Sequence, residues 1–163
     1  MWRLAIYFLA CMLAGSAFGQ ADKPDPADTA AVETCLKNAR ANSRPLERCI
    51  GVVADPCLDK SEDPSTYGMV RCSVREYEVW DERLNRTYKK LMTELEPAKR
   101  TELRDMQRAW ITFHEKKCDF HRVIEEGTVS IPLASYCGLE ETGRQALFLE
   151  EMLGDGDNPE AAR

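Results

Sequence analysis

The feature that most restricts the fold is an apolar pattern of helical period in the middle of the chain. The residues that carry it, three or four positions apart, are Tyr77, Trp80, Leu84, Tyr88, Leu91 and Leu95. This spacing places them all on one face of an α-helix. The segment Asp63-Pro64-Ser65-Thr66 precedes them and offers two capping side chains and a proline, which is typical of a helix start. The pattern therefore predicts one long amphipathic helix.

A second long helix is predicted directly after the first. Pro97 interrupts the first pattern and is suited to the opening turn of a new helix. The apolar residues that follow, again three or four positions apart, are Leu103, Met106, Trp110 and Phe113. This helix is expected to end near Cys118. Because the connection is short, we expect the two helices to be antiparallel neighbours.

Shorter elements flank this pair. Asp25 and Pro26 predict the start of a helix over 27–41, and Pro45 predicts a second short helix to about residue 54. A loop begins at Asp55, a long loop covers 119–136, and a last helix covers about 140–153. The expected fold is all-α: a small antiparallel bundle of two long helices, a third C-terminal helix and an N-terminal short helical hairpin, fastened by three disulfides.

The N-terminus has the composition of a secretory signal peptide. Arg3 precedes an apolar run that ends in small residues, and the run is shorter than the roughly 20 residues needed to span a membrane. We expect a signal peptide over 1–19, with cleavage as late as residue 21, then a lead-in over 20–26, one domain over 27–153 and a disordered tail over 154–163. The expected location is periplasmic or secreted, without stable membrane insertion. Lipid anchoring at Cys11 is disfavoured because the apolar run continues past it.

Six cysteines remain after removal of the signal peptide, and an even number in an exported chain predicts disulfides. In an antiparallel hairpin Cys35 and Cys49 lie at one level, which favours their pairing. Cys72 and Cys118 both lie off the apolar stripes of their helices, which disfavours a bridge between them. The local pairs Cys57–Cys72 and Cys118–Cys137 are favoured instead.

Composition and motifs disfavour several function classes. Loss of Arg3 leaves 21 basic against 28 acidic residues, a net charge of −7, which repels nucleic acid and favours a basic partner. His114, Cys118 and His121 share a helix face, but a metal site there would need a free thiol, so we expect no metal and no cofactor. The sequence shows no organised nucleophile and base, and we expect no enzymatic activity.

Two strings resemble the signature of the LprI-like lysozyme inhibitor domain family. The first is Trp80-Asp81-x-x-Leu84-Asn85-x-x-Tyr88-x-x-Leu91, and the second is Leu103-x-x-x-Gln107-x-Ala109-Trp110-x-x-Phe113 with Cys118 after it. Cys49-Ile50-Gly51 followed by Cys57 is similar to longer members, whereas Thr142 and Arg144 match only loosely. The resemblance covers roughly residues 35–153. One departure is the single Gly127, where the family often has a glycine pair.

The resemblance implies a small helical domain of the bacterial envelope that inhibits lysozyme, which is a basic enzyme. The expected function is binding and occlusion of lysozyme or another cationic protein, by a chain that is monomeric. The alternative is an envelope interaction module without lysozyme activity.

The candidate binding surface is the loop that a disulfide would close. Its expected contact residues are Glu125, Glu126, Gly127, Thr128 and Ser130, because a pre-organised acidic loop suits a basic partner.

The signature residues are expected to serve the fold. Trp80 and Trp110 are interpreted as core contacts. Asn85 is expected to bond a backbone group or Gln107, and Asp81 to pair with Arg144 or Arg108.

Overall fold

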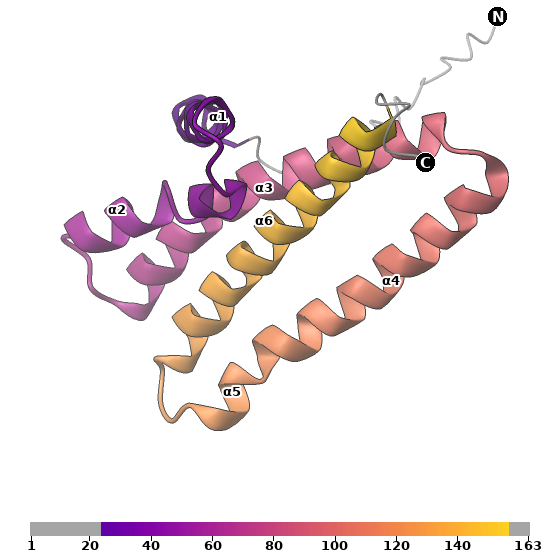
Figure 1. The fold of residues 1–163 in the computed structure, drawn as a ribbon. Coiled ribbons are helices and arrows are strands. Elements are labelled where there is room, and N and C mark those ends of the chain that lie inside the picture. The colour runs from indigo at the N-terminus through magenta and orange to yellow at the C-terminus, as the bar shows by residue number, and fades with distance from the viewer. Residues whose placement is uncertain (1–23, 157–163) are drawn as a thin grey trace, which may run out of the picture.

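The computed structural model describes residues 24–156. The elements are α1 (Pro26–Ala41), the 3₁₀ turn η1 (Leu46–Cys49), α2 (Ala54–Lys60), α3 (Thr66–Glu94), α4 (Pro97–Asp119), α5 (His121–Ile124) and α6 (Ser130–Gly156). Figure 1 shows that these residues contain helices and connecting turns only. The all-α prediction is confirmed.

Helices α1, α3 and α4 begin where the sequence predicts. The Asp25 side chain accepts a hydrogen bond from the Ala27 amide at 2.7 Å, one residue into α1. Ser65 does the same for Gly68 at the start of α3, at 3.1 Å. Pro97 is the first residue of α4, where a missing amide hydrogen leaves no bond unmade.

Helix α6 is the central element of the bundle. It lies between α3 and α4 (Figure 1), and its contacts with α3 are the most extensive in the fold. Helix α4 also contacts α6 more than it contacts α3. The bundle core therefore forms mainly between α3 and α6, around the fully buried side chains of Val79, Trp80, Leu139 and Leu149. This differs from the expectation that α3 and α4 form the central pair.

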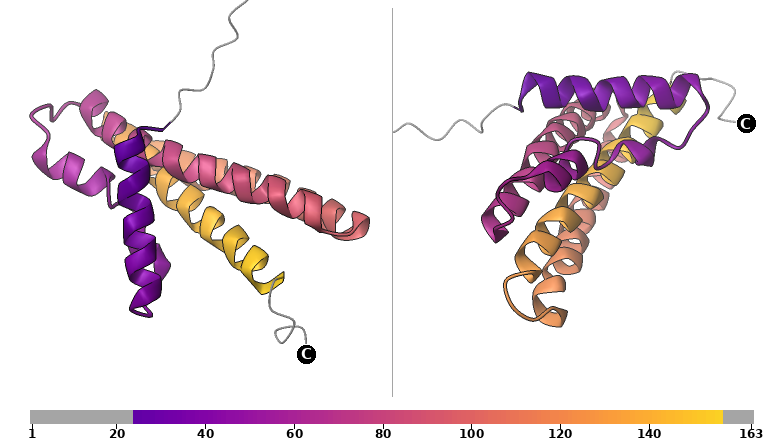
Figure 2. Two further views of the ribbon diagram at one scale, coloured as in Figure 1. Left: turned by 90° about the horizontal axis from the view of Figure 1, so that it is seen from above. Right: turned by 90° about the vertical axis from the view of Figure 1, so that its left-hand side faces the viewer.

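Helix α1 crosses the bundle instead of running alongside it (Figure 2). It buries Val32 and Leu36 against the core. Ion pairs made by two arginines of α3 support the crossing. Arg75 on α3 donates to Asp28 on α1 at 2.6 Å, and Arg83 on α3 contacts both Glu33 on α1 and Glu150 on α6.

Glu76 on α3 connects the η1–α2 segment to the core. Its carboxylate is completely buried and accepts hydrogen bonds from the backbone amides of Gly51, Val53 and Ala54, at 2.7 to 2.8 Å. The indole of Trp80 donates to the same carboxylate at 2.9 Å. A buried charge is tolerated when it is satisfied in this way.

Three disulfides link these elements. Cys35–Cys49 joins α1 to η1, Cys57–Cys72 joins α2 to α3, and Cys118–Cys137 joins α4 to α6. They are the three pairs that the sequence favoured. The third joins two long helices, so the bridges are not confined to the periphery of the fold.

Two boundaries expected from the sequence are wrong. The segment over 45–54 is a short 3₁₀ turn followed by α2, which includes Asp55, Pro56 and Cys57. Helix α6 begins at Ser130, so the expected loop over 119–136 contains α5 and the first turns of α6. The starts of α2 and α6 were missed for the same reason: Pro56 and Pro132 lie in the first turn of a helix, where proline is tolerated.

The ends of the chain extend beyond the described residues. Helix α6 continues to Gly156, so the predicted tail begins too early. The signal peptide over 1–19 and Cys11 lie outside the described part of the chain. Within residues 24–156 no helix is both long and apolar enough to cross a bilayer.

Candidate functional site

A groove of about 490 Å³ opens between α3 and α4. Its α3 wall consists of Tyr77, Asp81, Leu84, Asn85 and Tyr88. Its α4 wall consists of Arg104, Gln107, Arg108, Trp110, Ile111, His114 and Glu115. The groove exists because α3 and α4 both pack on α6 and contact each other little. Half of the residues in the two signature strings therefore line one concave surface.

Asp81 and Asn85 form a fixed polar pair on the α3 wall. The Asn85 side-chain amide donates to the backbone oxygen and to the carboxylate of Asp81, both at 2.9 Å. Burial raises the pKa of Asp81, and the hydrogen bond from Asn85 offsets only part of this effect. The backbone contact expected of Asn85 is confirmed. Of the two partners expected for Asn85, it is therefore the backbone group and not Gln107 that it bonds, whereas the expected pairing of Asp81 with Arg144 or Arg108 is wrong.

Those expected partners bond other residues in the structure. Gln107 hydrogen bonds Gln145 on α6. Arg144 pairs with Glu140 and Glu141 on its own helix, and Arg108 pairs with Asp105 on α4.

The α4 wall is basic and aromatic. Arg104 and Arg108 are one helical turn apart, and both are exposed. The Trp110 ring is half-buried and stacks on His114 with ring centroids 5.2 Å apart. Trp80 is a completely buried core residue, as expected, whereas Trp110 is at the edge of the core and also lines the groove.

The predicted binding loop is shorter than expected and forms the turn between α5 and α6. Glu125, Glu126 and Thr128 are exposed in it. Gly127 has a φ of +76°, a left-handed conformation that favours glycine. Ser130 is buried at the start of α6, and its hydroxyl donates to the Gly127 carbonyl at 3.0 Å. The loop therefore presents two adjacent carboxylates on a closed turn.

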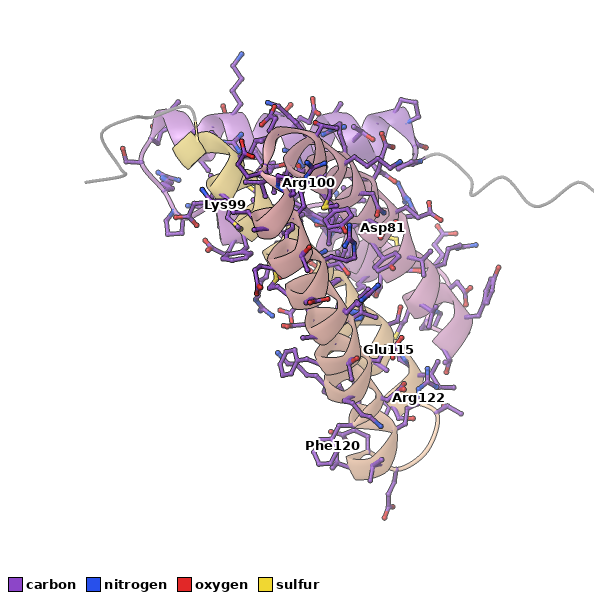
Figure 3. The ribbon with its side chains drawn as sticks, turned by 90° about the vertical axis from the view of Figure 1, so that its right-hand side faces the viewer. Asp81, Lys99, Arg100, Glu115, Phe120 and Arg122 are labelled. Carbon is purple, nitrogen blue, oxygen red and sulfur yellow. A yellow bond between two sulfur atoms is a disulfide. The ribbon has the colours of Figure 1, made fainter. Side chains whose placement is uncertain are left out.

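Exposed apolar side chains surround this turn. Phe120 is 56% exposed and Val123 is 77% exposed, and Ile124 and Val129 lie beside them in sequence and are also exposed. Figure 3 shows Phe120 and Arg122 at the end of the molecule where α4 meets α5, far from Lys99 at the other end of α4. We call residues 120–129 the tip. Adjacent exposed apolar residues of this kind are typical of interaction sites.

The sequence predicted the acidic part of the tip but missed its apolar part. It also missed Arg104 in the groove, and it considered Arg108 only as a partner of Asp81. The four-residue spacing of these arginines, which puts them on one helix face, was the available signal.

The residues weighed as a metal site do not form one. Cys118 is bonded to Cys137, and among residues 24–156 no group of three or more potential ligands is placed to hold a metal ion.

Comparison with known proteins gives one match. A family model described as lysozyme inhibitor LprI matches residues 57–149, more than half of the chain. This range includes both walls of the groove and the tip. No curated protein and no solved structure matches the chain.

Proposed function

Because the chain belongs to the LprI lysozyme inhibitor family, we propose that it inhibits lysozyme, or another cationic protein that acts on the cell envelope, by binding to its surface. Family membership is the observation that carries the proposal. The net charge of −6 supports it, since an acidic protein attracts a basic one and speeds their encounter. Three disulfides are typical of an oxidising compartment outside the cytoplasm, where such a partner is met.

We place the contact at the tip. Glu125 and Glu126 offer charge complementarity to a basic cleft, and the exposed Val123 and Ile124 offer apolar area to bury. Protein interfaces typically combine an apolar centre with a polar rim. The groove between α3 and α4 lacks a comparable acidic cluster.

The tip is held on a rigid support, which reduces the entropy lost on binding. Cys118–Cys137 fixes the end of α4 to α6. Lys117 on α4 donates to Glu141 on α6 at 2.8 Å, close to the same end. The turn is further closed by the Ser130 hydroxyl.

The test is lysozyme turnover with and without the purified protein, as a function of ionic strength. We expect inhibition that weakens as salt rises, because salt screens the attraction between exposed charges. The double variant Glu125→Gln/Glu126→Gln is expected to inhibit less. The matched control is Asp59→Asn/Glu62→Gln, which removes the same charge from exposed positions near the end of α2 and is expected to inhibit as the wild type does.

Two outcomes contradict parts of the proposal. Absence of inhibition at micromolar excess of the wild type would refute it and favour an interaction module without lysozyme activity. An equal loss of inhibition in the tip variant and in the control variant would be consistent with a general electrostatic attraction but would refute the contact at the tip.

A further inference from the structure

The groove between α3 and α4 has the chemistry of a small-molecule site, and this inference does not rest on the proposed function. Its volume of about 490 Å³ lies within the range of roughly 300–1,000 Å³ that is usual for such sites. None of its lining residues comes from α6, so it is a separate feature of the α3–α4 face. Figure 3 shows Asp81 and Glu115 along the same flank of α4.

The α3 wall presents hydrogen-bond acceptors. The amide hydrogens of Asn85 are directed at Asp81, which leaves the Asn85 carbonyl oxygen and one Asp81 carboxylate oxygen for a ligand. No cation pairs with Asp81 among the described residues, although burial in the groove makes its charge costly. Two acceptors one helical turn apart suit neighbouring hydroxyl or amide donors.

The α4 wall presents the opposite chemistry. Arg104 forms no ion pair within residues 24–156, and Arg108 has only an exposed pair with Asp105 at 3.3 Å. A guanidinium group binds a carboxylate through two parallel hydrogen bonds. This wall therefore suits a ligand that carries a carboxylate.

Aromatic rings line the groove on both walls. Tyr77 and Tyr88 on α3 and Trp110 on α4 are half-buried, so part of each side chain is open to the groove. The carbon–hydrogen faces of a sugar ring pack well on such side chains. An extended apolar ligand fits poorly, because it would bury Asp81 without a donor.

We propose that the groove between α3 and α4 binds a sugar that carries a carboxylate. The sugar hydroxyls donate to Asp81 and Asn85, the carboxylate pairs with Arg104 or Arg108, and the ring packs against Trp110.

The probe is N-acetylmuramic acid, titrated into the isotope-labelled protein and followed by amide chemical shifts. The matched probe is N-acetylglucosamine, which lacks the carboxylate-bearing substituent. We expect the acidic sugar to shift the Trp110 indole and the Asn85 side-chain amide, and to bind about tenfold more tightly than the neutral sugar.

Variants separate the two walls. Arg104→Gln/Arg108→Gln is expected to reduce the affinity for the acidic sugar to that for the neutral one. Asp81→Asn is expected to reduce the affinity for both sugars. The control is Arg86→Gln. Arg86 lies on the exposed face of α3, pairs with Glu82 at 3.8 Å and does not line the groove.

Equal affinity for the two sugars, shifts confined to residues outside the groove, or no shift at millimolar sugar would each overturn the proposal. Because Arg104 is exposed, its substitution leaves the fold intact, so a negative result with the arginine variant is decisive. Lysozyme inhibition is measured in a separate assay, so an absence of inhibition there would not change the conclusion about sugar binding.

Discussion

Two carboxylates on α3, those of Glu76 and Asp81, differ in how many hydrogen bonds they accept. Glu76 is buried and has four donors around one carboxylate, three of them from the η1–α2 segment. Asp81, five residues later, is partly buried, and within residues 24–156 it accepts only from Asn85. The first carboxylate satisfies buried backbone amides, whereas burial raises the pKa of the second, which means that the groove disfavours its charged form.

We expect Glu76→Ala to lower the free energy of unfolding by about 3 kcal/mol or more, because it leaves four buried donors without an acceptor. Urea unfolding followed by circular dichroism measures the change. The control is Glu82→Ala, which removes a carboxylate from the exposed face of the same helix and loses only an exposed pair. Unfolding of both variants at the same urea concentration would contradict this role of Glu76.

Asp81 predicts a pH dependence. Burial raises its pKa in the folded protein, so the folded state holds the proton more tightly than the unfolded state. Its stabilising contribution is therefore present below the ordinary pKa of the carboxyl and is lost as pH rises through the folded-state pKa. We expect Asp81→Asn to raise the melting temperature at neutral pH and to have no effect in acid.

Thermal melts of Asp81→Asn at several pH values test this expectation, with Asp59→Asn, an exposed carboxylate, as the control. A lower melting temperature at neutral pH would show that the charged form of Asp81 stabilises the fold. A residue that costs stability where it lines a groove is consistent with selection for binding.

At the scale of elements, the sequence predicted α1, α3 and α4 because the residues typical of a helix start precede an apolar pattern of helical period in each. The Ser65 cap and the run from Tyr77 to Leu95 define α3 without tertiary information. The start of α6 was missed because Pro132 and Gly138 are residues that usually end helices. In the structure Pro132 lies in the first turn, and Gly138 lies where α6 passes the His114 side chain.

The groove was not predictable from periodicity, although its residues were. A stripe shows which side of a helix faces inward, but not how deeply. Phe113 on the α4 stripe is 55% exposed, whereas Leu103 on the same stripe is buried. The difference depends on tertiary packing: Leu103 belongs to the core cluster, whereas Phe113 does not.

Two glycines inside α6 predict opposite responses to alanine. A Cβ at Gly138 would meet only His114, at 3.7 Å, which is an ordinary contact. A Cβ at Gly143 would meet the Ile50 side chain at 2.9 Å. We expect Gly138→Ala to stabilise the protein by about 0.5–1 kcal/mol through helix propensity, and Gly143→Ala to lose that gain or to destabilise.

The midpoints of urea unfolding for the two variants, measured side by side, test this pair. A matching stabilisation in both would mean that η1 moves aside for a methyl group at no cost. The contact between Ile50 and α6 would then contribute little to the position of η1.

At the scale of the whole molecule, α4 is the long helix that buries the fewest side chains. Its buried residues are Leu103, Gln107 and Cys118. The disulfide to Cys137 and the ion pair between Lys117 and Glu141 compensate at one end.

We expect Cys118→Ser/Cys137→Ser to lower the free energy of unfolding by about 3 kcal/mol, as loop entropy implies for a separation of 19 residues. Hydrogen exchange should accelerate over α4 more than over α3. The control is Cys35→Ser/Cys49→Ser, which should loosen α1 and leave α4 protected. Uniform acceleration in the first variant would show that α4 unfolds only with the rest of the bundle.

The central position of α6 has a consequence for how the chain is made. Among the described helices, the one that α3 packs against most extensively is synthesised after all the others, and it also emerges after them from any channel that moves the chain. Until then α3 and α4 have little surface to share, and Cys118 is without the thiol that it pairs with. A chain that stops before residue 130 can form the contacts and the two disulfides that join α1, η1, α2 and α3, but it lacks the helix on which α3 and α4 pack, so the bundle core can close only once α6 is present.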